Sequence, residues 1–431
     1  MRNEPLKLTV AACSALLLAL NALPTAAQSF LIRGATVHTA AERGTIEKAD
    51  VLVDNDRIDA VGHELEPSGT AEIIDGTGLH VTPGLFGGLA TFGLEEVSLE
   101  AAAVDHRAVS GELPPPAVPV LRPEFDVTRA YNPWSAAIAV NRAAGVTFAL
   151  LPATPSAGSS IIAGQGALAT LDGRYDAMLP RSQTLFVYFG GGLAQLTGYS
   201  RAAQYMLFDQ AVKEAQSSAR ASDADQRLLT PAGREALSSF LGGNRVVFAV
   251  DRAADIRQVI LLTERLRLRS AISGGAEAWH LATALARANI PVILDPLADL
   301  PANFDQLGAR LDNAAILNRA GVTILFSAAG GAPHNARKIR QLAGNAVANG
   351  LPWEAALKAI TTWPAEVFGT GDRLGSIEPG KQADLVLWDG DPLEVTSSAQ
   401  RVWIAGRAAN LDTRQKQLRD RYLIRKETTT E

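Results

Sequence analysis

The sequence predicts an α/β protein that combines a (β/α)8 TIM-like barrel with a small β-sandwich domain built from both termini. Three observations predict this fold. Between residues 85 and 370, short continuous apolar runs alternate with longer segments of helical periodicity, which is typical of parallel strands joined by crossover helices. Strand-like segments without such helices occur before residue 83 and after residue 370. No Gly-rich phosphate loop follows the first apolar run, which favours a barrel over an open doubly wound sheet.

The first residues have the features of a secretory signal peptide. Two basic residues precede an apolar stretch over residues 8–20, and small residues follow it. This order predicts export and cleavage after Ala27, so that residues 1–27 are removed and the mature protein is periplasmic or extracellular. A resemblance to a bacterial lipoprotein box leaves lipidation at Cys13 open. Most of the apolar stretch follows that cysteine, however, which argues against a lipid anchor.

Composition excludes several classes of function. Hydrophobic residues make up 47% of the 431 residues and charged residues 20%, which is enough to build a sizeable core. The chain has 40 Lys and Arg against 45 Asp and Glu, a formal net charge of −5, so no basic footprint predicts a nucleic-acid partner. No later stretch reaches the roughly 18 apolar residues that a membrane span needs. Cleavage would also remove the single cysteine, which excludes thiol chemistry in the mature chain.

The β-sandwich is predicted from two separated segments, residues 28–82 and 371–410. The first contains a strand-like run and then a hairpin around an Asp-Asn-Asp turn at residues 54–56. The second contains strand-like runs at 383–389 and 402–406, which most simply complete the N-terminal sheet. Three histidines of the first segment are expected at surface or capping positions: His38, His63 and His80.

The barrel is predicted over residues 83–370. Its expected strands are seven clear apolar runs and a weaker one near 167–171. Two insertions interrupt the pattern, a Pro-rich loop at 111–123 and a helical excursion at 200–243. Beyond the sandwich, residues 411–431 carry six basic and four acidic side chains, which is typical of a solvated tail. The seven clear runs are 85–90, 146–151, 184–189, 245–250, 270–273, 291–294 and 322–327.

Short motifs occur in both predicted domains. The most specific is Leu-Gly-Ser-Ile-Glu-Pro-Gly-Lys-Gln-Ala-Asp-Leu at 374–385; the others are Asp-Gly-Thr-Gly at 75–78, Thr-Pro-Gly-Leu at 82–85, Gly-Val-Thr at 145–147, Ile-Ala-Gly-Gln-Gly at 162–166 and Gln-Leu-Ala-Gly-Asn-Ala at 341–346. Together they resemble the amidohydrolase superfamily, in particular its secreted imidazolonepropionase-like and dipeptidase-like branch. The resemblance implies a barrel that holds one or two divalent metals such as zinc. The activity it implies is hydrolysis of C–N bonds in cyclic amides or of small peptides.

The resemblance also locates the expected metal ligands, and the matching positions lack donor side chains. The family's His-x-His pair ends the first barrel strand, where residues i and i+2 face the same side, but here the two positions hold Leu89 and Thr91. The histidine of strand five matches Ala249, and the aspartate of strand eight matches Ala329. No lysine occurs at 184–192, where the bridging lysine belongs. Because leucine and alanine cannot bind a metal, the sequence predicts no cofactor.

Titratable residues near the predicted strand ends remain as catalytic candidates: Asp251, Glu277, His280 and His334. Barrel enzymes keep their chemistry at this face, so a metal-free site built from these residues is one interpretation. The other is that the acidic residues cap helix N-termini, where the helix dipole favours a carboxylate. The pair Asp105–His106 is equally open, as a general acid/base couple or as an ion pair within a loop.

Two functions are compatible with these patterns. The first is a pseudoenzyme that keeps the amidohydrolase fold for binding or for pairing, with an active amidohydrolase-like protein or with itself as partner. The second is an active hydrolase of C–N bonds with a remodelled site. The fold motifs support both, whereas the emptied ligand positions support only the first.

Overall fold

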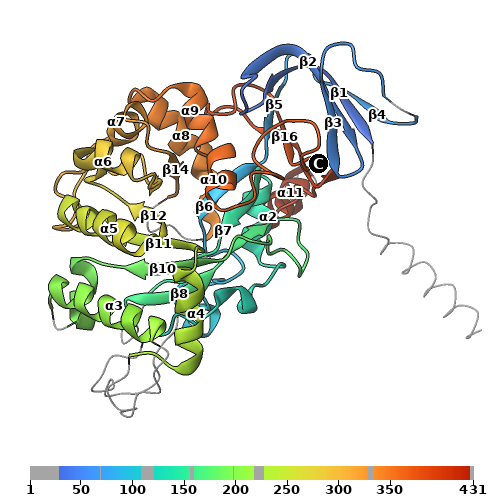
Figure 1. The fold of residues 1–431 in the computed structure, drawn as a ribbon. Coiled ribbons are helices and arrows are strands. Elements are labelled where there is room, and N and C mark those ends of the chain that lie inside the picture. Colours follow the sequence, from blue (N-terminus) through green and yellow to red (C-terminus); the bar gives the residue numbers. More distant parts are fainter. Residues whose placement is uncertain are drawn as a thin grey trace, which may run out of the picture.

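A computed structural model describes residues 29–67, 69–107, 121–155, 160–197, 199–217, 228–328 and 333–427. The predicted signal peptide with Cys13, most of the Pro-rich insertion and Ala329 lie outside the described residues. Within the described residues, the chain forms an eight-stranded, a six-stranded and a three-stranded sheet, with helices packed around the latter two (Figure 1).

Strands from both ends of the chain share the eight-stranded sheet. They are β1 (Phe30–His38), β2 (Thr45–Asp54), β3 (Arg57–Gly62), β4 (Glu72–Asp75), β5 (His80–Pro83), β15 (Leu385–Trp388), β16 (Ala399–Ile404) and β17 (Arg407–Ala408). Their order is β17-β16-β15-β5-β1-β2-β3, with β4 also paired to β1. The two ends of the chain meet where β5 pairs antiparallel with β15. Figure 1 shows this sheet, blue and red-orange, at one end of the molecule.

The eight-stranded sheet has an apolar cluster of its own. Phe30 of β1 and Trp403 of β16 stack with their ring centroids 4.9 Å apart, although 373 positions separate them in the sequence (403 − 30). Alternating burial along β3 and continuous burial over the second half of β2 bring further apolar side chains into the cluster. The hydrogen bonds join these strands in one sheet, and a two-sheet sandwich stays a prediction.

The middle of the chain supplies the other two sheets. The six-stranded sheet has the order β14-β13-β12-β11-β10-β8, and the three-stranded sheet has the order β6-β7-β9. Their strands are β6 (Leu85–Leu89), β7 (Val146–Leu150), β8 (Ile162–Gly166), β9 (Leu168–Thr170), β10 (Thr184–Tyr188), β11 (Arg245–Val250), β12 (Arg269–Gly274), β13 (Val292–Leu294) and β14 (Ile324–Phe326). Neighbouring strands from β10 to β14 are parallel.

Two strands depart from the all-parallel pattern that the sequence predicts. The segment 162–170 carries both β8, which is antiparallel to β10, and β9, which is antiparallel to β7. The described residues between β7 and β9, and those between β8 and β10, contain no helix, whereas parallel neighbours need a crossover connection that is usually a helix. This bent segment links the six-stranded sheet to the three-stranded one.

The two sheets approach each other again at β6 and β14. The Leu89 backbone N–H donates to Ser327 Oγ at 2.9 Å. Gly88, with a φ of +78°, permits this approach, because an added Cβ would lie 2.8 Å from Ser327 Cα. In the part of the chain that the structure describes, strand ladders do not close the two sheets into a continuous barrel.

Helices cover the outer faces of these two sheets. Helix α5 packs on β11 and β12, and α7 and α8 pack on β14. Helix α4 begins with a Thr230 cap and Pro231, whose missing N–H costs nothing at that position. The α-helices are α2 (Ala136–Arg142), α3 (Arg201–Gln216), α4 (Pro231–Leu241), α5 (Ala253–Leu266), α6 (Ala282–Arg287), α7 (Asn313–Arg319), α8 (Ile339–Ala348), α9 (Trp353–Lys358), α10 (Thr362–Val367) and α11 (Arg414–Glu427). None of the described helices is long and apolar enough to cross a membrane.

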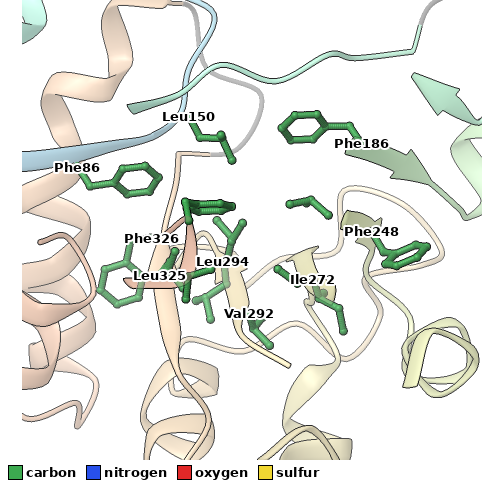
Figure 2. Close-up of a cluster of buried hydrophobic side chains, with 14 of the residues drawn as sticks. Phe86, Leu150, Phe186, Phe248, Ile272, Val292, Leu294, Leu325 and Phe326 are labelled. Carbon is green, nitrogen blue, oxygen red and sulfur yellow. The ribbon is translucent and has the colours of Figure 1, made fainter. Parts of the chain in front are cut away.

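Apolar side chains of the two sheets form a single large core. Figure 2 shows Phe86, Phe186, Phe248 and Phe326, from β6, β10, β11 and β14, with aliphatic side chains between them. All five residues of β7 are buried, as expected for a strand covered on both faces. This core supports the strand ends at which the candidate site lies.

Candidate functional site

A cavity of about 530 Å³ lies where β6 and β10 to β14 end. Side chains at the ends of parallel strands meet at one edge of a sheet, which is the usual position of active sites in barrel enzymes. The residues that these strand ends contribute to its wall are Leu89, Tyr188, Phe189, Val250, Asp251, Gly274, Leu294, Asp295, Ser327 and Ala328.

Three of the positions that match the family's metal ligands lie along this cavity. Leu89 is the last residue of β6, Thr91 lies two positions after it, and Ala249 comes from β11. The fourth, Ala329, lies outside the described residues, although Ala328 next to it lines the cavity. The described residues contain no group of three or more His, Cys, Asp or Glu side chains able to hold a metal ion. Absence of a bound metal stays a prediction.

Asp251, at the end of β11, is the one member of the predicted catalytic set that lines the cavity. Its Oδ1 accepts a hydrogen bond from Ala276 N at 3.2 Å, and its Oδ2 accepts one from Gln306 Nε2 at 2.8 Å. Burial raises the pKa of Asp251, and the nearby charges of Asp305 and Glu277 raise it further, while the two hydrogen bonds oppose this. A carboxylate in this environment favours either a proton or a cationic neighbour.

Glu277 has the structural role that the second interpretation gives to acidic residues. Its Oε2 accepts a hydrogen bond from Ala253 N at 2.8 Å, in the first turn of α5. Its Oε1 accepts another from Gly308 N at 3.1 Å. Both oxygens therefore satisfy backbone donors, and the side chain does not line the cavity.

The two histidines of the predicted set lie away from the cavity. His280 is exposed, and its ring stacks on Trp279 with centroids 3.5 Å apart. His334 is exposed at the start of the 3-10 segment Pro333–Lys338. Neither lines the cavity, so the structure does not bring Asp251, Glu277, His280 and His334 together in one site.

A hydrogen-bonded group that the sequence did not suggest occupies one wall of the cavity. His106 Nε2 lies 3.0 Å from Glu95 Oε2, and His106 Nδ1 lies 2.7 Å from Thr154 Oγ1. Thr91 Oγ1 donates to the same Glu95 oxygen at 3.1 Å. The sequence paired His106 with Asp105, but its carboxylate partner is Glu95. The chain folds back between these residues through an isolated bridge of Glu95 with Val104, which no spacing rule signals.

The environment of His106 lowers the pKa of its ring and so favours the neutral form. Burial is the largest influence and lowers its pKa, although Glu95 acts in the opposite direction. A neutral ring that donates from Nε2 to the Glu95 carboxylate has an unprotonated Nδ1, which can accept the Thr154 hydroxyl proton. The group of Thr91, Glu95, His106 and Thr154 is thus internally satisfied and carries one negative charge.

Another carboxylate of the cavity wall is held by a cation. Asp305 forms an ion pair with Arg201 at the start of α3, and its Oδ2 accepts a hydrogen bond from Gly191 N at 2.6 Å. The same arginine lies 3.5 Å from Asp255, measured from Nε to Oδ2. These contacts join the loop after β13 to the segment after β10 across the cavity wall.

One histidine of the N-terminal sheet differs from its expected surface position. His38 is only 7% exposed, and its Nε2 lies 2.9 Å from His80 Nδ1. Its ring also packs against Trp353 of α9 at 4.6 Å. Strand pairing of β1 with β5 brings the two histidines together across 42 positions, a contact that depends on the sheet register. The exposed position expected for His63 agrees with the structure.

Comparison with known proteins finds similarity to amidohydrolases. Residues 334–409 match the model of the amidohydrolase family. A 59-residue stretch is 52% identical to Amidohydrolase tasK of Hapsidospora irregularis, which is 14% of this chain and 6% of that much longer protein. An amidohydrolase from Thermotoga maritima MSB8 has a TM-score of 0.74 and 26% sequence identity, over 88% of this chain and 99% of that chain.

Two further solved structures show likeness in fold alone. A prolidase complexed with N-methylphosphonate-L-proline has a TM-score of 0.52 and 16% identity, over 89% of this chain and 100% of that one. Molinate hydrolase has a TM-score of 0.53 and 15% identity, over 90% and 96%. The family match at 334–409 and the likeness to the Thermotoga maritima amidohydrolase support a relationship of this chain to the amidohydrolase superfamily.

Proposed function

We propose that this chain is a metal-free member of the amidohydrolase superfamily, a pseudoenzyme that acts by binding rather than by metal-dependent hydrolysis. We place it in the secreted imidazolonepropionase-like and dipeptidase-like branch, exported after cleavage behind Ala27. The finer architecture belongs to the same proposal: a TIM-like barrel at 83–370 and a β-sandwich formed by 28–82 and 371–410. The motifs at both ends of the chain and the shared eight-stranded sheet support it.

The observation that carries this proposal is the composition of the cavity wall. Leu89, Thr91 and Ala249 line it at positions where the family resemblance expects ligands. A catalytic metal needs about three protein ligands and a water molecule. A leucine or alanine side chain offers none, and a threonine hydroxyl already bonded to Glu95 is a poor ligand for zinc.

The remaining acidic side chains support the same proposal, because most of their hydrogen-bonding capacity is used within the protein. Glu277 bonds to two backbone N–H groups, and Asp305 to Arg201 and a backbone N–H group. A hydroxyl paired with a base does occur in the described cavity wall, where Thr154 contacts His106, and this pair counts towards the alternative function below.

A partner is part of the proposal, either an active amidohydrolase-like protein or a second copy of this chain. The loop after β13 supports an interaction surface, because it presents four exposed apolar side chains next to the cavity. They are Leu297, Leu300, Phe304 and Leu307. Size-exclusion chromatography with light scattering, followed by pull-down from the native compartment, tests for such a partner.

One observation favours the alternative, an active hydrolase with a remodelled site. Asp251 has a raised pKa, lines the cavity and shares it with His106. A carboxyl group of this kind is a candidate general acid or base. The alternative predicts hydrolysis of a cyclic amide or dipeptide that is lost in Asp251→Asn.

Metal analysis separates the two functions. Protein purified after growth with zinc and manganese should hold far less than one metal ion per chain by inductively coupled plasma mass spectrometry. The variants His280→Ala and His334→Ala should give the same result. About one tightly held ion per chain, lost in either variant, would overturn the metal-free proposal.

A further inference from the structure

Three side chains in the cavity wall form a hydrogen-bonded chain that ends in a hydroxyl group. Thr154 Oγ1 lies 2.7 Å from His106 Nδ1, and His106 Nε2 lies 3.0 Å from Glu95 Oε2. All three residues line the cavity. A hydroxyl, an imidazole and a carboxylate in this order, with each contact within about 2.6–3.2 Å, are the elements of a nucleophilic triad.

The carboxylate determines which nitrogen of the His106 ring carries the proton. An ionised carboxylate only accepts hydrogen bonds, so Nε2 is the donor to Glu95. In the neutral ring, Nδ1 is then unprotonated and accepts the hydrogen bond of the Thr154 hydroxyl. The hydroxyl proton therefore already points towards the base that would remove it.

Backbone contacts hold the three side chains together, although they come from separate segments after β6 and β7. Thr154 N donates to the His106 carbonyl oxygen at 2.9 Å. Glu95 pairs with Val104 in an isolated bridge, and its Oε2 also accepts a hydrogen bond from the Thr91 hydroxyl at 3.1 Å. The alignment of hydroxyl, ring and carboxylate is thus set by the fold before any ligand binds.

The base and its carboxylate are largely shielded from water. The side chains of His106 and Glu95 are only 10% and 11% exposed. Thr154 is partly exposed and lines the cavity. A molecule in the cavity can therefore meet the hydroxyl group, while the base behind it is protected from solvent.

The rest of the cavity wall favours a small uncharged compound. Leu89, Leu193, Ile293 and Leu294 contribute apolar surface. The volume of about 530 Å³ falls within the roughly 300–1,000 Å³ of small-molecule sites. Carboxylates occur in the wall, and none of its described residues is Lys or Arg, so an anionic substrate would be repelled.

We propose that Thr154 is a nucleophile for acyl transfer from small uncharged esters, with His106 as its general base and Glu95 as a positioning residue. This role goes beyond the proposed binding function. It shares with that function only a cavity without a catalytic metal, because the triad uses no metal ligand.

The reaction has two steps. In the first, Thr154 Oγ1 bonds to the ester carbonyl carbon, His106 Nδ1 takes the hydroxyl proton, and the carbonyl electron pair moves onto its oxygen. Return of this pair breaks the bond to the alcohol, which leaves with the proton from Nδ1. In the second, water gives a proton to Nδ1 and bonds to the acyl carbon. The bond to Thr154 breaks, Oγ1 regains the proton, and a carboxylic acid is released.

The charges around His106 predict the pH dependence of this reaction. Burial lowers the pKa of the ring, and Arg107 acts in the same direction, whereas Glu95 and Asp105 raise it. Because the ring must be neutral to accept a proton, the rate should fall only below pH 6.5. A base with a lowered pKa is weak, which suits an ester better than an amide, since an alcohol leaves more easily than an amine.

Mass spectrometry of the purified chain after treatment with an alkyl fluorophosphonate tests for the nucleophile. Oγ1 bonds to phosphorus and fluoride leaves, so peptide mapping should find one adduct per chain, on Thr154. Thr154→Val should abolish this adduct and slow the hydrolysis of p-nitrophenyl butyrate about 100-fold or more, and His106→Ala should slow it to a similar extent. Thr154→Ser, which keeps a hydroxyl group, should retain both the adduct and the hydrolysis.

Glu95→Gln tests the positioning role. The adduct should still form on Thr154, and hydrolysis should be slower. Because the charge of Glu95 raises the pKa of His106, its removal should also move the acid limb of the rate to lower pH. A rate that falls without any shift of this limb would contradict the positioning role.

Thr36→Val is the matched control. It removes a hydroxyl that donates to a carboxylate, Glu47 Oε2 at 2.8 Å, but Thr36 does not line the cavity. It should change neither the adduct nor the rate. Absence of an adduct on Thr154 of the wild type, or an unchanged rate in Thr154→Val, would overturn the triad and leave the metal-free proposal untouched. Hydrolysis that disappears with a chelator and returns with zinc would instead overturn the proposed function.

Discussion

The junction between the two ends of the chain and the expected ligand positions in the cavity differ in polarity. At the junction, Trp388 Nε1 donates to Thr82 Oγ1 at 2.9 Å, and Asp384 accepts hydrogen bonds from Gln382 and Ala405. In the cavity, leucine and alanine occupy positions where the family resemblance expects imidazoles. The difference teaches that the residues that hold this fold together are separate from those that would bind a metal.

This separation has a physical cause. If only some ligands of a metal site were replaced, the remaining ones would be buried polar groups without partners, which destabilises the fold. Replacing all the ligands by apolar side chains avoids this loss of stability. The polar residues of the junction motif at 374–385 cannot be replaced in this way, because their hydrogen bonds connect strands from both ends of the chain. Motifs of this kind therefore carry evidence about the fold rather than about activity.

The largest expected effect is loss of stability at the junction. Trp388 is fully buried, and its ring lies against Gly145, where an added Cβ would be 2.7 Å from Cη2. Trp388→Ala should cost about 3–5 kcal/mol of unfolding free energy in urea titrations, as buried aromatic deletions do. The control Trp134→Ala removes a 75% exposed ring and should stay within about 0.5 kcal/mol. Equal losses in the two variants would mean that the junction is not a principal support.

The next effect concerns pH and the buried histidine of the N-terminal sheet. Burial, and then the charge of His80, lower the pKa of His38 to about 4, although Asp391 and Glu47 oppose the shift. A lowered pKa means that the His38 ring binds a proton less tightly in the folded protein than in the unfolded chain. Stability is therefore full above pH 6.5 and falls as the pH drops towards 4, by up to about 3 kcal/mol.

Urea titrations of His38→Gln between pH 7 and pH 4 measure this contribution. The variant should lose much of the acid-dependent destabilisation that the wild type shows. His63→Gln, which changes an exposed histidine of the same sheet, should keep it. An unchanged pH slope in His38→Gln would contradict the assignment.

A smaller effect of opposite sign is expected at Asp384. Burial raises the pKa of this carboxyl to about 6, and hydrogen bonds from Ala405 and Gln382 oppose the shift. A raised pKa contributes stability that is present below pH 3.8 and is lost as the pH rises through 6. Asp384→Asn should therefore gain about 1–2 kcal/mol relative to the wild type at pH 8, since the amide keeps an acceptor oxygen. Denaturant titrations at pH 4 and pH 8 measure the difference, and no gain at pH 8 would contradict it.

Much of the fold could be predicted from the sequence, because strand burial leaves a local pattern. The continuous apolar runs at 146–151, 184–189 and 245–250 became β7, β10 and β11. The direction of the strand near 167–171 could not be predicted, since pairing is set by the connection and by distant neighbours. The register that joins His38 to His80 is non-local in the same way.

The candidate site was less accessible to sequence reasoning. Matching motifs to the family located Leu89, Thr91 and Ala249 along one cavity wall, since their spacing follows from strand geometry. Glu95 and Thr154 were missed, because one lies in a loop that folds back on itself and the other meets His106 across 48 positions of the sequence. A possible signal for the first was the Glu95 carboxylate close to His106 in an apolar context.

The smallest change in stability is expected for the two exposed histidines, His280 and His334. Their variants also help to separate the pseudoenzyme from the hydrolase with a remodelled site. His280 and His334 are exposed and do not line the cavity, so His280→Ala and His334→Ala should change stability by less than about 0.5 kcal/mol. The matched contrast is His106→Ala, which would remove the ring that contacts Thr154 and Glu95, leave Glu95 with the Thr91 hydroxyl, and should cost about 1–3 kcal/mol. Hydrolytic activity that disappears in His280→Ala but survives in His106→Ala would contradict this order, because chemistry would then depend on residues outside the cavity rather than within it.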